Sequence, residues 1–342
     1  MTGNEAIAEG AIRAGCRFYA GYPITPQNEL TAYMARHMPQ EGRVFIQAES
    51  ELAAVNMVFG ASATGVRAMT SSSSPGISLK QEGISYLAGC RLPAVIVNIM
   101  RGGPGLGNIA PSQADYFQAT KGGGHGDYHS IVLAPASVEE AYRTMFDAFD
   151  LADTYRTPVM VLGDGMLGQM MEPLILEKGP VRQHAKTWAL TGCRGRKPNI
   201  VRSLFLKEGV LEALNLQLQK KYKAIQQKEQ RWEELLVEDA SVILVAYGGM
   251  ARIVKEAVRG LRAGHKKIGF IRPISLWPFP VKAFRRPGKK SVKYLVVEMS
   301  YGQMVEDVRL AVECRAPVEF FGRSGGGIPT EEEILKKLHT MS

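Results

Sequence analysis

The chain has 342 residues, of which 45% are hydrophobic and 22% are charged, proportions of a soluble globular protein that exclude disordered, collagen-like and coiled-coil chains. Its 42 lysines and arginines exceed its 33 acidic residues, which gives a formal net charge of +9, and its length favours two domains. Four widely spaced cysteines, with no C-x-x-C pair among them, exclude an iron–sulfur or zinc framework held by this chain alone.

Leader and membrane signals are absent from the sequence pattern. The N-terminal residues carry no basic and apolar leader, and the longest apolar stretch, residues 92–100, is too short to span a bilayer. Cysteines without close partners also fit a reducing compartment. We therefore expect a cytoplasmic protein with no membrane segment.

Strand-like and helix-like segments alternate through the first half. A capping box formed by Thr2 and Glu5 predicts a first helix that runs to about residue 14. The predicted strands cover residues 17–21, 44–47, 66–71, 92–99, 131–134 and 158–162. The other predicted helices cover residues 49–64, residues 77–87 and a segment that begins at Ser137. This alternation indicates parallel βαβ units with both faces of the sheet covered.

The second half begins with an irregular segment and then resumes the alternation. Residues 172–207 are predicted to be a linker or an arm, and a long helix is predicted over residues 208–237. The later predicted strands cover residues 242–246, 268–272, 294–297 and 318–321, with helices over 250–263, 303–312 and 330–338. The prediction is therefore two doubly wound α/β domains, residues 1–171 and 238–342, joined by residues 172–237.

Two loops that follow predicted strands present polar groups. Ligands of open parallel sheets bind beyond the carboxyl ends of the strands, so these loops are candidate sites. Residues 22–26, Tyr-Pro-Ile-Thr-Pro, present the hydroxyl of Thr25 on a stiffened backbone, although a rigid structural turn explains them as well. Arg101, followed by glycines that permit close backbone approach, suits a carboxylate or phosphate, but the glycine spacing is not a dinucleotide fingerprint.

Glu51 is the acidic residue whose surroundings are least polar. It begins a predicted helix rich in Ala, Val and Met, where a carboxylate needs a dedicated partner or becomes protonated. The alternative is an ordinary acidic residue that complements the helix dipole, worth about 0.3–1 kcal/mol. The serines of residues 71–74 also leave two interpretations open, because their hydroxyls suit either a ligand or a helix cap.

A glycine-rich loop, residues 121–129, contains three potential metal ligands. His125, Asp127 and His129 alternate along it, and alternate residues in such a loop lack a pre-formed ligand geometry. A flexible lid is therefore the favoured interpretation, and we assign no metal ligand to this chain.

Taken together, these segments resemble the α subunits of 2-oxoacid:ferredoxin oxidoreductases over nearly the whole chain. The segments that carry the resemblance are residues 22–26, Glu51 ahead of Gly60-Ala61-Ser62, Ser74-Pro75-Gly76, Arg101-Gly102-Gly103-Pro104 and residues 272–280. The resemblance implies a thiamine diphosphate pyrimidine-binding domain followed by a transketolase C-terminal-like domain.

The resemblance also implies roles for four residues. Glu51 matches the catalytic position that hydrogen-bonds the aminopyrimidine ring of the cofactor and favours its imino tautomer. Pro23 matches a residue that lines the cofactor site, and Thr25 and Arg101 match positions that hold the substrate carboxylate. Gly163-Asp164-Gly165 begins like the Mg²⁺-diphosphate motif of thiamine enzymes, but no asparagine follows until Asn199, so a tight turn is predicted there.

Partners are implied in the same way. A β subunit would supply the diphosphate site with its Mg²⁺ and an iron–sulfur cluster, γ and δ subunits would complete the complex, and ferredoxin would accept the electrons. The chain alone is predicted to be inactive. The complex would convert a 2-oxoacid and coenzyme A into acyl-CoA and CO₂.

The substrate class is drawn from two loops. Residues 105–113 and 121–128 resemble the branched-chain group, which acts on 2-oxoisovalerate (3-methyl-2-oxobutanoate), and the alternative is a 2-oxoglutarate or general 2-oxoacid enzyme. From another class, the 31 basic and 18 acidic residues of positions 171–342 leave open a nucleic-acid-binding chain. Their mixed-charge stretches instead favour a solvated surface. A purely structural subunit is the third alternative.

Overall fold

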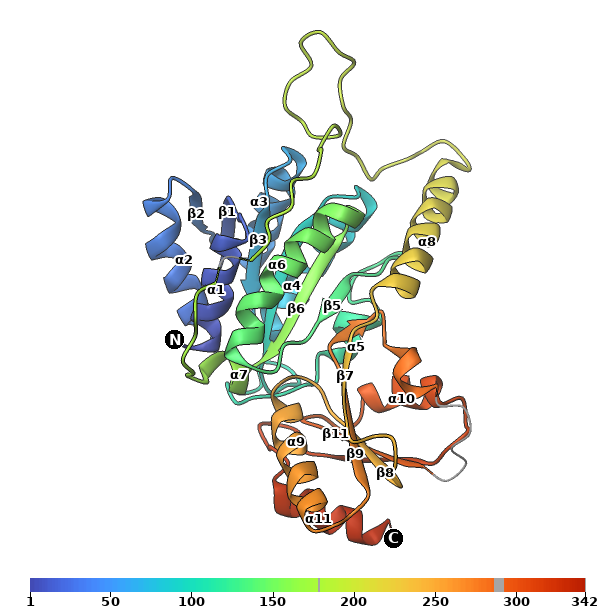
Figure 1. Ribbon diagram of the computed structural model, residues 1–342. Coiled ribbons are helices and arrows are strands. Elements are labelled where there is room, and N and C mark those ends of the chain that lie inside the picture. The colour runs from blue at the N-terminus through green and yellow to red at the C-terminus, as the bar shows by residue number, and fades with distance from the viewer. Residues whose placement is uncertain (178, 286–291, 342) are drawn as a thin grey trace.

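The structure, a computed structural model, describes residues 1–177, 179–285 and 292–341. Two β-sheets flanked by helices, one of seven strands and one of five, organise the chain (Figure 1). The predicted α/β class and the alternation of strands and helices are confirmed.

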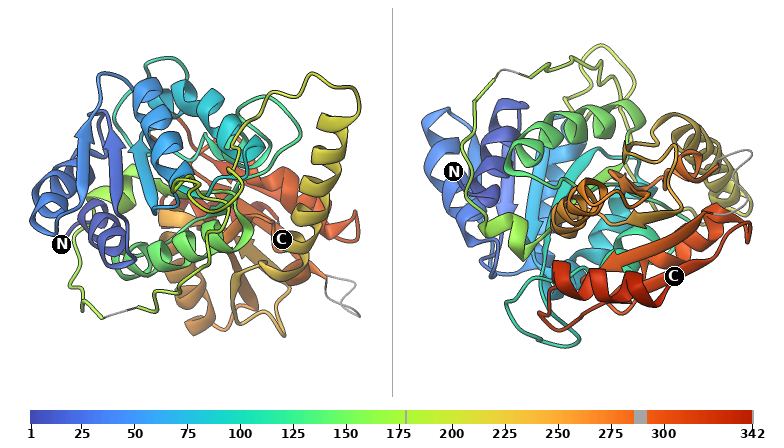
Figure 2. Two further views of the ribbon diagram at one scale, coloured as in Figure 1. Left: turned by 90° about the horizontal axis from the view of Figure 1, so that it is seen from above. Right: turned by 60° about the horizontal axis from the view of Figure 1, so that its bottom comes forward.

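The seven-stranded sheet has the order β10-β5-β6-β4-β3-β1-β2 and is parallel except for β10, which runs antiparallel to β5. Its strands are β1 (Phe18–Gly21), β2 (Val44–Gln47), β3 (Ala68–Ser72), β4 (Ala94–Met100), β5 (Ile131–Leu133), β6 (Pro158–Asp164) and β10 (Ser275–Trp277). Its helices are α1 (Gly3–Arg13), α2 (Asn28–Gln40), α3 (Glu51–Ala63), α4 (Ser74–Gly89), α5 (Tyr116–Thr120), α6 (Val138–Tyr155) and α7 (Gly165–Gln169). Helices α1 and α6 lie side by side on one face, and α3 and α4 cover the other (Figure 2).

The five-stranded sheet has the order β12-β11-β8-β9-β7 and is parallel except for β7. Its strands are β7 (Trp232–Leu235), β8 (Val242–Val245), β9 (Ile268–Pro273), β11 (Lys293–Glu298) and β12 (Val318–Gly322). The helices of this half are α8 (Val210–Lys228), α9 (Gly248–Ala263), the 3₁₀ helix η1 (Val281–Phe284), α10 (Met304–Val312) and α11 (Glu331–Thr340).

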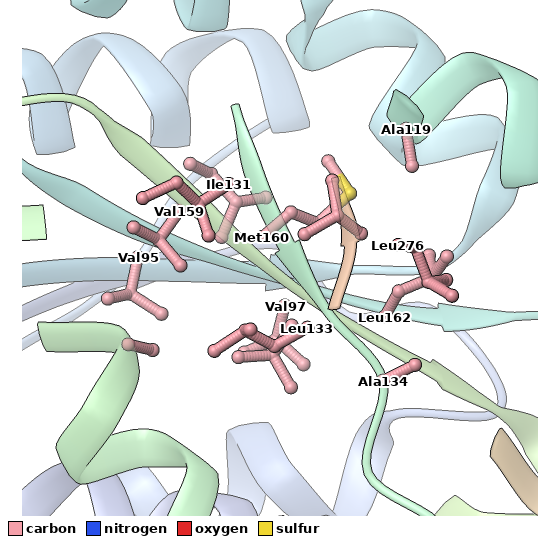
Figure 3. Packing of buried hydrophobic residues seen from close by; sticks show 14 of the residues in the cluster. Val95, Val97, Ala119, Ile131, Leu133, Ala134, Val159, Met160, Leu162 and Leu276 are labelled. Atoms are coloured by element: carbon pink, nitrogen blue, oxygen red, sulfur yellow. The ribbon is translucent and has the colours of Figure 1, made fainter. Parts of the chain in front are cut away.

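The core of the first sheet lies on its central strands. Every residue of β4 and β6 is buried, so both faces of these strands are covered and their sequences are nearly continuous apolar runs. Figure 3 shows Val95 and Met160 from these strands packed in one cluster with Leu276 of β10. Each such buried side chain contributes about 1.5–3 kcal/mol.

The helix predicted over residues 208–237 is wrong beyond Lys228. There α8 ends, and after a short connection β7 pairs antiparallel with β9. Glu233 of β7 lies 2.8 Å from the guanidinium of Arg272, and Leu235 faces Phe270. Because these partners are distant in the sequence, local periodicity does not reveal that the segment is a strand.

Helix α2 and strand β10 have no counterpart among the predicted elements. α2 carries Pro39 in its last turn and buries only four of its residues, which weakens its periodic signal. β10 has three residues, and its register shifts between Ser275 and Trp277. A strand this short leaves no readable alternation.

The described residues between α7 and α8 form an irregular arm, as predicted for 172–207. This arm crosses the face formed by α1 and α6, where the hydroxyl of Tyr142 donates to the carbonyl of Glu177 and Lys186 pairs with Asp153. The amide of Leu190 donates to the carbonyl of Ala63 at 2.9 Å, and the chain then projects away from the second sheet (Figure 1). Within the described ranges, no helix combines the length and the apolar character needed to cross a membrane.

Candidate functional site

The candidate site lies at the carboxyl edge of the first sheet. β1, β3 and β4 are neighbours in the sheet, and β2 pairs with the outer side of β1. The parallel arrangement therefore places the loop after β1, the start of α3, the start of α4 and the loop after β4 at one edge. Three of these segments carry the four residues singled out in the sequence: Pro23 and Thr25 follow β1, Glu51 begins α3, and Arg101 follows β4.

Glu51 is the first residue of α3 and is only 5% exposed. Ser50 caps this helix by accepting a hydrogen bond from the amide of Ala53 at 3.1 Å. A Cβ on Gly76 would lie 2.5 Å from Glu51 Oε1 and 2.1 Å from Ser72 Oγ, so only glycine lets α4 begin this close. None of the hydrogen bonds among the described residues reaches the Glu51 carboxylate, which leaves it available to a ligand.

Arg101 is buried and held in place by backbone carbonyls. Its Nη1 donates to the carbonyl of Thr25 at 3.0 Å and its Nη2 to the carbonyl of Leu106 at 3.1 Å. Its Nε is buried and has no partner among the described residues. The guanidinium is thus fixed before any ligand binds, with a donor to spare for a carboxylate.

Thr25 lies beside Arg101, but its hydroxyl accepts a hydrogen bond from Asn28 Nδ2 at 3.2 Å. Thr25 is half-buried and precedes Pro26 through a cis peptide bond. Pro23 is exposed, as is Tyr22, so both side chains are presented at the surface of this edge.

Further buried polar atoms without partners cluster at the ends of β3 and β4. They are Ser72 Oγ, Ser73 Oγ and Asn98 Oδ1, within the described part of the chain. Buried polar atoms in proteins are normally hydrogen-bonded, so a group of orphans at one sheet edge indicates a ligand site. Ser74 joins the two strands' loops, because its Oγ accepts from the amide of Arg101 at 3.0 Å.

Two further charged residues of this site were not found by the sequence analysis. Asp115 accepts hydrogen bonds from Ser74 Oγ at 2.6 Å and Asn98 Nδ2 at 2.9 Å, and burial raises the pKa of its carboxyl. Lys80 is fully buried in α4, and burial lowers the pKa of its ammonium to about 7, an effect that the charge of Glu51 opposes. The sequence signal for Lys80 is its place on the apolar stripe of α4, between Ile77 and Ile84.

Asp164, from the Gly163-Asp164-Gly165 segment, has a capping role. Its Oδ1 accepts from the amide of Leu167 at 3.0 Å, which begins α7, and its Oδ2 accepts from the amide of Gly249 at 2.8 Å, which begins α9. The carboxylate is fully buried, and burial raises its pKa. The prediction of a tight turn here is wrong, because Gly163 and Asp164 end strand β6 and Gly165 directly begins α7. Asp164 caps α7 and also joins the two halves of the chain.

The three potential ligands of residues 121–129 do not meet. His129 stacks on Trp277 with ring centroids 4.5 Å apart, whereas the carbonyls of His125 and Asp127 accept from Ser85 and Gln219 respectively. In the part of the chain that the structure describes, no three His, Cys, Asp or Glu side chains are grouped as a metal site. Contacts to α4 and α8 hold this loop along its length.

Comparison with known proteins identifies the class. Residues 9–235 match the family described as pyruvate flavodoxin/ferredoxin oxidoreductase, thiamine diphosphate-binding, and residues 240–334 match pyruvate:ferredoxin oxidoreductase core domain II. The chain belongs to the 2-oxoacid:ferredoxin oxidoreductase family and is a subunit of such an enzyme.

Two relatives that match the chain over its full length are subunits of enzymes named for different 2-oxoacids. The chain is 52% identical to the ketoisovalerate oxidoreductase subunit VorB of Methanothermobacter marburgensis, with 100% of this chain and 97% of the relative covered. It is 38% identical to the 2-oxoglutarate synthase subunit KorA of Methanothermobacter thermautotrophicus, with 100% and 98% covered.

Solved structures agree with the family. The 2-oxoglutarate:ferredoxin oxidoreductase of Magnetococcus marinus superposes on 99% of this chain with a TM-score of 0.86 at 28% identity, and this chain spans 64% of the length of that one. A split gene transketolase superposes on 99% of this chain and 97% of its own length, with a TM-score of 0.62 at 14% identity, which shows a shared fold. The predicted relation to transketolase-like folds is thereby confirmed.

Proposed function

We propose that this chain is the α subunit of a thiamine diphosphate-dependent oxidoreductase that converts 2-oxoisovalerate and coenzyme A into acyl-CoA, CO₂ and reduced ferredoxin. The observation that carries the proposal is that the first turn of α4 contacts both candidate groups. Ser74 bonds the backbone of Arg101, and Gly76 lies against the carboxylate of Glu51. We infer from these two contacts that the Glu51 carboxylate, as an acceptor, and Arg101, as a cation, serve one ligand site.

These residues fit the cofactor and the substrate. The free, nearly buried carboxylate of Glu51 suits a hydrogen bond to the nitrogen-rich pyrimidine ring of thiamine diphosphate, and Pro23 would line that site. When bound, thiamine diphosphate supplies the carbanion stabilisation that decarboxylation of a 2-oxoacid requires. Glu51 would hold or release the proton at the ring, and Arg101 with Thr25 would hold the carboxylate of the substrate.

The preference for a branched-chain 2-oxoacid is supported by relatives and by one loop. Two VorB subunits are 52% and 50% identical to this chain, against 36–40% for the KorA subunits. Leu106, whose carbonyl bonds Arg101, is 81% exposed and offers an apolar side chain beside the carboxylate-binding group. One methylene in an apolar site discriminates by about 1–3 kcal/mol, so overlapping activity on 2-oxoglutarate is expected.

We further propose that neighbouring subunits complete the site. A β subunit would hold the diphosphate, its Mg²⁺ and an iron–sulfur cluster, while γ and δ subunits and ferredoxin would complete electron transfer. The loops and helices that carry the site residues also expose apolar side chains, namely Tyr22, Leu52, Leu79, Leu106 and Ile109. Exposed apolar side chains close together are typical of a surface that a partner covers. The free cysteines, Cys16 and Cys90 among them, support a cytoplasmic location.

The decisive experiment compares substrates with the assembled complex. Dye reduction in the presence of coenzyme A should show a kcat/KM at least tenfold higher for 2-oxoisovalerate than for 2-oxoglutarate. A clear preference for 2-oxoglutarate would overturn the substrate assignment, and no reduction with any 2-oxoacid would overturn the function.

A second measurement tests the nucleic-acid alternative. We expect that the isolated chain does not bind DNA at physiological salt, and salt-dependent binding would support the alternative. That alternative is already weakened by the acidic partners that many basic residues of the second half have, including Arg252, Lys255, Arg262, Arg272 and Lys337.

A further inference from the structure

Lys80 is a buried cation beside the catalytic carboxylate. Its side chain is fully buried, and its Nζ donates to Thr70 Oγ1 at 3.0 Å and to the backbone carbonyl of Glu51 at 3.3 Å. It therefore ties the centre of α4 to the first residue of α3 and to β3 at once. No other residue of the described chain ties the backbone of Glu51 to α4 by a side-chain hydrogen bond.

The charge of Lys80 lies on the face of α4 that meets α3. Gly76, one turn earlier, contacts the Glu51 carboxylate, and Gly83, one turn later, leaves a Cβ position only 2.5 Å from Val55. Yet Lys80 and the Glu51 carboxylate form no ion pair within 4.0 Å. The ammonium thus acts on the carboxylate through space and leaves its oxygens free to bond a ligand.

We propose that Lys80 is a positioning residue for Glu51: it fixes the backbone at the start of α3 and places a positive charge on the side of α4 that faces the Glu51 carboxylate. This inference rests on the proposed function, because it assigns Glu51 to the thiamine site. The ammonium is not explained by stability, since an unpaired buried cation is costly and an apolar residue of similar length would pack there.

The protonation of Lys80 makes the inference measurable. Burial lowers its pKa to about 7, and Glu51 on α3 is the one charged group that acts appreciably on it within the described residues. Its other partner, Thr70 on β3, is neutral. As pH rises past neutrality the charge is lost, so its support of Glu51 should fade over the same range.

The test uses the assembled complex with Lys80→Met, which shortens the side chain by one atom, keeps it unbranched and removes the charge. Thiamine diphosphate dissociation constants are measured by calorimetry at pH 6 and pH 8.5, together with kcat and KM. We expect the ratio of the variant's Kd to that of the wild type to be at least tenfold at pH 6 and near one at pH 8.5. The KM for the 2-oxoacid should change less than twofold, because Arg101 is untouched.

Two further variants separate this role from general disruption. Arg67→Met removes another buried cation, paired with Asp153 at 2.8 Å beyond the opposite end of β3, and should leave the Kd unchanged. Lys80→Arg keeps the charge at all pH values and should bind within threefold of the wild type at pH 6 and more tightly than it at pH 8.5. If Lys80→Met does not assemble, this last comparison decides.

A Kd ratio for Lys80→Met that is near one at both pH values, or equally large at both, would overturn the inference. The proposed function fails separately. If the wild-type complex neither binds thiamine diphosphate nor turns over a 2-oxoacid, the function is wrong. If it does both and Glu51→Gln abolishes turnover while Lys80→Met behaves as the wild type, only the role of Lys80 is wrong.

Discussion

Asp164 and Gly249, 85 residues apart, are joined by a hydrogen bond of 2.8 Å from the Gly249 amide to the Asp164 carboxylate. Because the second carboxylate oxygen caps α7, one buried side chain begins two helices in two halves of the chain. A Cβ on Gly249 would lie 2.7 Å from Asp164 Oδ1, so the close approach requires glycine. The Gly-Asp-Gly segment therefore has a structural task, which is to cap α7 and to hold the start of α9 against the first half of the chain.

The first prediction tests that task. Asp164→Asn keeps the shape but offers one acceptor oxygen for two amide donors, so we expect a loss of about 1–3 kcal/mol in the free energy of unfolding. Urea unfolding measures it. The thiamine diphosphate affinity of the folded complex should remain within twofold, whereas a fall of a hundredfold or more would show that Asp164 holds the cofactor's metal instead.

The second prediction concerns Glu51. Glu51→Gln keeps the size but cannot exchange a proton with the cofactor ring, so turnover should fall to below 1% of the wild type while the complex still assembles. Steady-state dye reduction and size-exclusion chromatography measure the two properties. Glu49→Gln, exposed and two residues away, is the matched control and should keep full activity. Near-normal turnover in Glu51→Gln would favour a purely structural subunit.

The third prediction concerns Arg101. In the wild type, the planar guanidinium bonds two carbonyls and leaves Nε available to a ligand. Arg101→Lys keeps the charge but loses this planar group, so KM for the 2-oxoacid should rise at least tenfold. Substrate titration of the assembled complex measures this rise. Arg91→Lys, an exposed site before β4, should leave KM unchanged. An unchanged KM in Arg101→Lys would mean that another cation binds the carboxylate.

The fourth prediction concerns substrate choice. Leu106→Ser removes apolar contact next to Arg101, so kcat/KM for 2-oxoisovalerate should fall by about 5- to 50-fold, and that for 2-oxoglutarate should fall less than threefold. Competition between the two substrates measures the preference. Ile109→Ser, in the same loop and 65% exposed, is the control. Equal losses on both substrates would contradict a role for Leu106 in specificity.

The fifth prediction follows from the pKa of Lys80. Its usual value of 10.5 falls to about 7 on folding, so between these pH values the unfolded chain binds the proton and the folded chain does not. Wild-type stability relative to Lys80→Met should therefore rise with pH over this window. Lys80→Met should be the more stable protein at pH 6, by at most about 5 kcal/mol, and the difference should shrink towards pH 10.

Thermal unfolding at pH 6 and pH 10 measures that difference. Arg67→Met gives the opposite sign, because it leaves Asp153 with one buried partner fewer and should destabilise the fold. A lower stability of Lys80→Met at pH 6 would show that its hydrogen bonds to Thr70 and Glu51 outweigh the cost of burying its charge.

Much of the fold could be predicted because its signals are local. The capping boxes at Thr2 and Thr330 mark helices that begin one residue later, and the apolar runs of β4 and β6 mark the sheet centre. β7 and β10 could not be predicted, because each forms a strand by pairing with another strand that is far away in the sequence.

The candidate site divides in the same way. Glu51, Thr25 and Arg101 stand out because their residue types follow predicted strands, and the structure brings Thr25 and Arg101 into contact. The contact is made by the Thr25 carbonyl, however, and its hydroxyl bonds Asn28. Asp115 and Lys80 escaped prediction because their importance lies in burial and in partners on other elements, which spacing along the chain does not reveal.

Strand β10 comes from the second half of the chain and completes the edge of the first sheet beside β5. A fragment that ends before residue 275 would expose the backbone of β5 and uncover the apolar cluster around Leu276. The two sheets consequently do not form two independent folding units. If the gene were split between them, each of the two fragments would expose apolar surface and would be prone to aggregate.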